Sequence, residues 1–170
     1  MTTGPTPQRL AAWRAYIESS QRLLTVLGDA LREGCGLSLA DYHVLLLLAE
    51  SPERRLRMGE LAGRLVFSPS RLTYQIATMQ RRGLVRRESC PQDRRGALAV
   101  LTDQGLASLR AAAPQHLAEV QRHFLDHLDD ADVTQLGRVF TALDRRLGGP
   151  ATSGDCDVAN EPTRTAGKRI

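Results

Sequence analysis

The sequence predicts a mainly α-helical fold with one small β-hairpin. Aromatic residues make up only 4% of the chain, so the core must consist mostly of Leu, Val and Ala, and stretches rich in Leu and Ala favour helices. Apolar residues recur every three or four positions through most of the chain, which is typical of one buried helix face. Residues 84–102 are the exception, because two strand-like runs flank a polar, arginine-rich turn there.

The chain has 170 residues, the length of a single domain. We expect the folded part to span residues 9–147. Residues 1–8 are rich in Pro, Thr and Gly, and residues 148–170 are rich in Gly, Thr and Asp with almost no apolar side chains. Such segments bury too little apolar surface to fold, so both ends are expected to be disordered.

Two helices are expected at the start of the domain. The first covers residues 9–33 and ends at the Gly-Cys-Gly junction 34–36. Ser38 is suited to cap a second helix that runs to about Glu50, with Asp41 at its third position. The second helix is apolar nearly all round, which predicts that it is buried.

Two shorter helices follow, over residues 60–65 and from Ser68 to Gly83. Ser68 is expected to cap the latter, and Pro69 occupies its first position, where a missing N–H costs nothing. Gly83 is a typical helix end. The buried stripe of this helix is formed by Leu72, Ile76 and Met79.

The hairpin leads through Thr102 into a long helix whose apolar stripe extends to Leu128. Pro114 falls inside that stripe and is expected to kink or divide the helix. The acidic segment 129–132 then begins a last helix, whose stripe ends at Leu147.

Positive charge is concentrated in the middle of the chain. Residues 54–95 contain eleven arginines and three acidic residues, a net charge of +8, whereas the whole chain carries +4. The remaining residues therefore carry a net charge of −4. A basic centre within an acidic remainder indicates a module that binds a polyanion.

A capped helix followed by a hairpin with arginines at its tip is the arrangement by which a winged helix holds DNA. The helix enters the major groove and the tip reaches the neighbouring groove. Arginine and glutamine suit base edges, while serine hydroxyls and free N–H groups at a helix start suit phosphate. The residues expected to contact DNA on this helix are Ser68, Ser70, Arg71, Thr73, Tyr74 and Gln75. Arg81 and Arg82 extend the same outward face.

Over residues 9–147, the chain resembles the MarR family of winged-helix transcriptional regulators. The motifs that carry the resemblance are GELA at 59–62, SPSRLT at 68–73, GLVRR at 83–87, and Asp93-Arg94-Arg95 followed by Leu101-Thr102. The resemblance implies that Asp93 orients Arg95, whose guanidinium enters the minor groove, and that Arg86, Arg87 and Arg94 contact phosphate. The alternative for Asp93 is that it only forms the turn. Tyr74 stands where the family often has an arginine, and a tyrosine cannot donate two hydrogen bonds to guanine.

The first and last helices indicate a homodimer. Their apolar stripes are too long for one small winged helix, expected over about residues 38–102, to cover. We expect helices 9–33 and 103–147 to pair across a two-fold axis. Such a dimer presents two recognition helices to the half-sites of a pseudopalindromic double-stranded DNA operator, about 34–36 Å apart.

The resemblance also implies that a small ligand or an oxidant controls DNA binding. Trp13, Tyr42 and His43 are candidate walls of a site for a phenolic or other aromatic effector; plain core packing is the alternative. Cys35 and Cys90 are candidate oxidant sensors, with inert thiols as the alternative. His123 and His127 lie four residues apart, but the histidine spacing does not complete a metal site. We expect no metal and no cofactor.

These observations predict a homodimeric, sequence-specific DNA-binding transcriptional regulator, a repressor that a small ligand releases. The alternative is a winged-helix module that binds protein or RNA without operator specificity. Enzymatic activity is not expected, because nucleophile-elbow, phosphate-loop and zinc-protease motifs are absent. The three cysteines form no CxxC pair, and the chain lacks a secretory start or a membrane-length apolar run. A cytoplasmic location is therefore expected.

Overall fold

The computed structural model describes residues 4–90 and 93–148, with the backbone alone at residues 90 and 93–95. The expected disorder of residues 1–3 and 149–170 lies outside the described residues. The helices are α1 (Pro7–Cys35), α2 (Leu39–Ala49), α3 (Met58–Leu65), α4 (Pro69–Arg81), α5 (Asp103–His123) and α6 (Asp130–Arg146). The strands are β1 (Arg55–Arg57), β2 (Val85–Cys90) and β3 (Asp93–Leu101), and short 3-10 turns cover Pro52–Arg54 and Leu125–His127.

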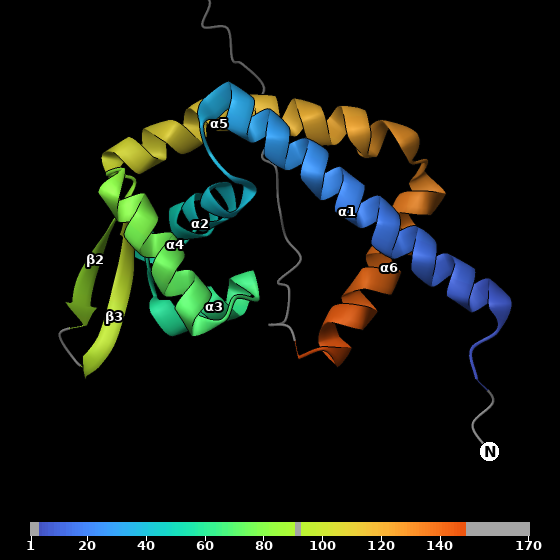
Figure 1. Ribbon diagram of the computed structural model, residues 1–170, viewed down its shortest axis with the longest axis horizontal. Helices are drawn as coiled ribbons and strands as arrows, with labels where there is room; N and C mark the ends of the chain where they lie inside the picture. The colour runs from blue at the N-terminus through green and yellow to red at the C-terminus, as the bar shows by residue number, and fades with distance from the viewer. Residues whose placement is uncertain (1–3, 91–92, 149–170) are drawn as a thin grey trace, which may run out of the picture.

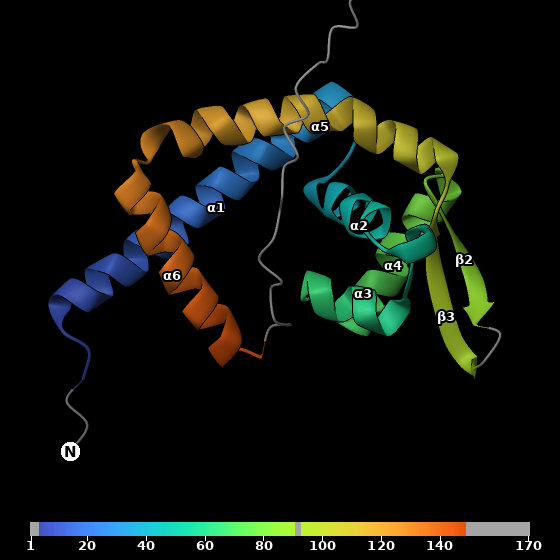
Figure 2. The same cartoon turned by 180° about the vertical axis from the view of Figure 1, so that it is seen from behind.

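The elements form a winged helix with two long helices lying across it. Helices α2, α3 and α4 pack beside an antiparallel sheet of order β1-β3-β2. Helix α5 arches over this unit and α1 runs beside it, and both extend away from the sheet toward α6 (Figures 1 and 2). The predicted fold class, mainly α with a small β-hairpin, is confirmed.

The core lies where α2, α4 and the sheet meet. Helix α2 is buried on several sides, as its composition predicts, with Val44, Leu45 and Leu48 fully enclosed. Helix α4 contributes the expected stripe Leu72, Ile76 and Met79. Burial of such side chains contributes about 1.5–3 kcal/mol each relative to full exposure. Helix α4 is therefore held against the core by apolar contact along one face.

Local signals at the helix ends predict the boundaries well. Ser38 and Asp41 form a reciprocal capping box at the start of α2, and Thr102 caps α5. Gly36 and Gly83 adopt positive φ angles of 64° and 72°, which favour glycine and end α1 and α4.

Three features differ from the expectations. Strand β1 was not expected, because three residues are too few for an alternating pattern to stand out; Leu56 is its one buried residue and pairs with Ala99. Helix α3 begins two residues before the expected Glu60. Helix α5 is not divided at Pro114, whose ring is exposed while Ala112 packs into the core. The chain breaks instead at Phe124.

None of the helices within residues 4–90 and 93–148 combines the length and the apolar character that a membrane span requires.

Candidate nucleic-acid interface

The N-terminal half of α4 presents polar side chains to solvent. Ser68 caps the helix, since its Oγ accepts a hydrogen bond from the backbone N–H of Arg71 at 3.3 Å. The hydroxyls of Ser68 and Ser70 lie 3.2 Å apart. The Thr73 hydroxyl donates to the Pro69 carbonyl at 2.8 Å. The positive end of the helix dipole lies at this capped end, which suits it to a phosphate.

Arg71 and Tyr74 are the large side chains that this face exposes. The guanidinium carbon of Arg71 lies 3.9 Å from the centroid of the Phe67 ring, a cation–π contact that limits its freedom. Tyr74 is 72% exposed. The guanidinium has the geometry to donate two hydrogen bonds to a guanine, and the tyrosine ring can pack on a thymine methyl group. Both side chains are thus available for base-edge contact.

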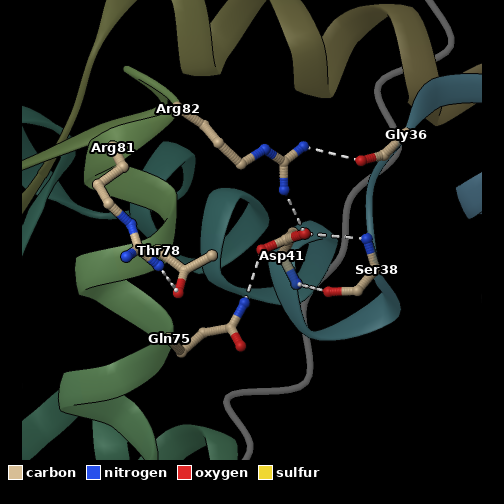
Figure 3. Close-up of polar contacts among 7 residues, drawn as sticks. All are labelled: Gly36, Ser38, Asp41, Gln75, Thr78, Arg81 and Arg82. Atoms are coloured by element: carbon tan, nitrogen blue, oxygen red, sulfur yellow. Dashed lines mark hydrogen bonds and ion pairs between the residues drawn. The ribbon is translucent and has the colours of Figure 1, made fainter.

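Gln75 and Arg82 turn inward to a carboxylate on α2 (Figure 3). The Gln75 amide nitrogen donates to Oδ1 of Asp41 at 2.6 Å, and the Arg82 guanidinium donates to Oδ2 at 2.9 Å. The Gln75 amide is therefore engaged within the protein, and a base contact requires it to leave Asp41. Its role as a base reader stays a prediction.

The arginines of strand β2 divide between the two faces of the hairpin. Arg86 pairs with Glu88 on the same face, with Nε 2.6 Å from the carboxylate oxygen. Arg87 is exposed on the opposite face. Glu88 offsets part of the positive charge of Arg86, so Arg87 is the less compensated of the two cations. A phosphate contact by Arg86 stays a prediction.

The tip of the hairpin carries the expected DNA-binding residues Asp93, Arg94 and Arg95. The backbone of Asp93 pairs with Cys90 across the hairpin, beyond an irregularity at Ser89. The side chains of residues 90 and 93–95 lie outside the described part of the structure. The expected pairing of Asp93 with Arg95 therefore stays a prediction.

The three candidate effector residues fall into two groups. Trp13 lies beside Tyr16, with ring centroids 6.0 Å apart, and Tyr16 contacts Phe140 of α6 at 5.6 Å. Tyr42 instead packs on His116 of α5 at 4.3 Å, and the ring of His43 lies 6.3 Å from that of Tyr42. The structure thus brings Tyr42 and His43 together at the contact between α2 and α5.

His116 was not among the expected site residues. Leu109 and Ala112 are buried on α5, and His116 follows Ala112 by four positions, so it lies on the same helix face. This spacing was the sequence signal that could have placed His116 at the site. Its Nδ1 atom is buried without a hydrogen-bond partner. An orphaned buried nitrogen of this kind costs free energy and favours a polar ligand or an ordered water there.

Burial affects the protonation of Tyr42, His43 and His116. It lowers the pKa of His116, and the positive charge of His43 lowers it further. Burial also lowers the pKa of His43. The pKa of Tyr42 is raised by burial and by the negative charge of Glu50. All three rings are therefore neutral near pH 7, which suits contact with an uncharged aromatic molecule.

The two candidate redox residues differ in what the structure describes. Cys35 is half-buried, and its thiol lies 3.5 Å from the side-chain oxygen of Gln115. The Gln115 amide in turn donates to the Ala30 carbonyl at 3.2 Å. The side chain of Cys90 lies outside the described residues, so a sensing role for either thiol stays a prediction. Among the side chains that the structure describes, which exclude those of residues 90 and 93–95, no group of three His, Cys, Asp or Glu is placed to hold a metal.

Comparison with known proteins places this geometry in a family. The profile of the MarR family matches residues 36–96, which include α2, α3, α4 and most of the hairpin. The repressor YetL of Bacillus subtilis is 31% identical over 113 residues, covering 65% of this chain and 68% of YetL.

Two solved structures from Streptomyces coelicolor extend the likeness to the long helices. AbsC, a MarR family transcriptional regulator, is 41% identical with a TM-score of 0.81, over 88% of this chain and 100% of AbsC. Sco3205, a MarR family regulator solved in complex with DNA, is 38% identical with a TM-score of 0.82, over 85% of this chain and 94% of that chain. The capped recognition helix, the arginine-rich hairpin and these relatives together show that the chain belongs to the MarR family of transcriptional regulators.

Proposed function

We propose that the protein is a homodimeric, cytoplasmic transcriptional repressor that binds a pseudopalindromic operator and is released by a small aromatic ligand. The observation that carries the DNA-binding part is the direction of α4. Its capped N-terminal end and the outer ends of β2 and β3 lie on the same side of the winged helix, away from α5 (Figure 1). A helix and a hairpin so placed suit adjacent grooves of one duplex.

Two relatives support the finer parts of this proposal. Sco3205 was solved with DNA bound, and YetL is named a repressor. In this chain, Ser68, Ser70, Arg71, Thr73 and Tyr74 would face the major groove, and Gln75 would join them only by leaving Asp41. Arg86 and Arg94 would contact phosphate, and Arg95, oriented by Asp93, would enter the minor groove, where a narrow groove attracts arginine.

The homodimer is supported by apolar surface that the single chain leaves open. Helix α6 buries none of its residues, and α1 buries only its C-terminal end. The exposed apolar residues along α1, α5 and α6 are Leu10, Trp13, Tyr16, Leu24, Val26, Leu117, Val133, Val139, Phe140 and Leu143. Exposed apolar side chains gathered on three helices favour an interaction site there, and a two-fold pairing of these helices would bury them.

The effector site is proposed at the group formed by Tyr42, His43 and His116. It lies where α2 of the winged helix contacts α5, so a ligand that separates these rings would also shift the winged helix against the long helices. The orphaned Nδ1 of His116 offers a polar partner to a phenolic hydroxyl. Trp13 would line the site only if the dimer brings it there from another copy.

The test is a mobility-shift assay on the intergenic DNA upstream of the protein's own gene. We expect retarded complexes at nanomolar protein and release by phenolic compounds; peroxide and reductant are added separately to examine Cys35 and Cys90. Retention of the complex in every phenol would contradict the effector proposal. Equal competition by an unrelated RNA hairpin would favour the alternative, a binding module without operator specificity.

A further inference from the structure

Asp41 is a nearly buried carboxylate that gathers three hydrogen-bond donors. Its side chain is 5% exposed. Oδ1 accepts from the Gln75 amide, while Oδ2 accepts from the Arg82 guanidinium and, at 2.9 Å, from the backbone N–H of Ser38. A buried charge is tolerated only with such partners, since losing one leaves the ion uncompensated. Asp41 therefore holds α4 at two points, 34 and 41 residues further along the chain.

Arg82 connects the end of α4 to three other elements. One arm of its guanidinium binds Asp41 at the start of α2, and the other donates to the Gly36 carbonyl at the end of α1, at 2.7 Å (Figure 3). Its backbone carbonyl accepts a hydrogen bond from the Gln104 side chain of α5 at 3.2 Å. The two long helices and the recognition helix thus meet at one residue.

The neighbouring arginine has none of these connections. Arg81 is exposed and donates to Thr78, one turn earlier on the same helix, at 3.1 Å. The sequence places Arg81 and Arg82 alike on the outward face, but the structure separates their roles. Arg82 resembles Arg81 in charge and helix position and differs in what it binds, so Arg81 is a matched control.

We propose that Asp41 and Arg82 are positioning residues that set the angle of the recognition helix relative to α1 and α5. The inference rests on the proposed function. In a dimer joined through the long helices, this angle fixes the separation and tilt of the two recognition helices. The planar guanidinium holds its two acceptors in a fixed geometry, which a lysine ammonium cannot reproduce. The pair therefore selects operators by the spacing of their half-sites and reads no base.

The decisive variant is Arg82→Lys, which keeps the charge and removes the two-armed contact. Binding is measured on a set of duplexes whose half-sites are moved apart or together by single base pairs. We expect affinity for the best wild-type operator to fall about tenfold. The loss should be smaller on duplexes of altered spacing, and the salt dependence of binding should not change. Arg81→Lys should stay within about twofold of wild type on every duplex.

Asp41→Asn provides a second, independent variant, because it keeps the acceptor for Gln75 and removes the charge that Arg82 binds. It should flatten the spacing preference in the same way, and adding Arg82→Lys to it should cost little more. Circular dichroism confirms that each variant is folded.

Two results would overturn the inference. The first is an unchanged spacing preference in both variants. The second is an Arg82→Lys loss that is equal on all duplexes, which identifies a phosphate contact. If the wild-type protein binds no duplex, the proposed function itself fails, whereas sharp wild-type binding with unchanged variants refutes only the positioning role.

Discussion

Arg71 and Gln75 lie one turn apart on α4 and have different surroundings. Arg71 is exposed and held against Phe67, while Gln75 is bound to the buried Asp41. A side chain that is exposed yet restrained loses little entropy when it binds a base. Arg71 is therefore the base reader we expect to contribute most.

Replacing Arg71 with alanine should relax the sequence preference at one base pair in each half-site. The loss of discrimination expected is about 1–3 kcal/mol, that of one arginine–guanine contact. Selection from a random duplex library measures it, with Arg110→Ala, an exposed arginine of α5, as the control. An unaltered motif from the Arg71→Ala protein would show that Arg71 reads no base.

At the hairpin tip, Arg95→Ala should weaken binding to every duplex without changing the motif. One fewer cation near the phosphates releases one fewer counterion, so the slope of log affinity against log salt should become shallower by about 1. Fluorescence anisotropy at several salt concentrations measures the slope. An unchanged slope would show that Arg95 does not enter the minor groove.

His116 links stability to pH. The fold lowers the pKa of His116 below its ordinary value of 6.5. As the pH falls below about 6.5, the unfolded chain therefore binds a proton at His116 before the folded protein does. The free energy of unfolding should therefore be highest above about pH 6.5 and fall on acidification, by at most about 1.4 kcal/mol per pH unit for one proton. Urea denaturation at pH 5 to 8 should show a shallower fall for His116→Gln. Identical slopes in the two proteins would contradict this assignment.

Single residues were predictable from sequence where their partners are local. The caps at Ser38 and Ser68 depend on a backbone N–H three residues away, so a short motif reveals them. The bonds of Asp41 to Gln75 and Arg82 join separate helices. Sequence spacing does not show them, and Arg82 was therefore expected on the outward face.

At the scale of elements, α5 is attached to the base of the hairpin by close backbone contact. Gly105, in the first turn of α5, faces the carbonyl oxygen of Leu84, and a β-carbon there would fall well inside van der Waals distance of that oxygen. The Thr102 hydroxyl adds a hydrogen bond to the Gly83 carbonyl at 2.7 Å. The first turn of α5 is thus in direct contact with the backbone that leads into β2, and we expect the two to move together.

Gly105→Ala should destabilise the protein by about 1–3 kcal/mol, because the added methyl group forces α5 away from the Leu84 carbonyl. Gly63→Ala in α3 is the matched control: its β-carbon meets no atom within 4 Å, and alanine favours a helix by about 0.5–1 kcal/mol over glycine. Chemical denaturation measures both. Equal stability of the two variants would show that the contact is loose.

Elements were predictable in proportion to their length. Long helices repeat their apolar spacing often enough to be recognised, and α1, α2 and α4 lie close to their expected bounds. Strand β1 has only three residues and depends on pairing with β3, which sequence alone does not reveal. The continuity of α5 through Pro114 comes from packing against α1 and α2, which outweighs the local preference.

At the scale of the whole molecule, the exposed apolar faces of α1 and α6 are the surface through which the proposed dimer would form. Phe140 contacts Tyr16 between these helices and is still 39% exposed. A carboxylate at this position would have to be buried in a dimer at a large cost in free energy.

Phe140→Asp should therefore shift the protein from dimer to monomer in sedimentation equilibrium and weaken operator binding, since two half-sites can no longer be held together. Val66→Asp is the control for sedimentation, because Val66 is 89% exposed on the turn before α4 and lies outside the long helices. A wild-type protein that sediments as a monomer would contradict the dimer, whereas a Phe140→Asp protein that stays dimeric would place Phe140 outside the interface.

The sheet order has a consequence for how the hairpin meets DNA. Strand β1 pairs only with residues 98–100 of β3, so the hairpin is a three-stranded sheet at its base and a two-stranded ribbon beyond. Two-stranded ribbons twist more readily than wider sheets. The three-stranded base of the hairpin is thus expected to be stiffer than its two-stranded outer part. In the proposed complex, we expect this outer part to adjust to minor grooves of unequal width in the two halves of an imperfect operator while the three-stranded base keeps its shape.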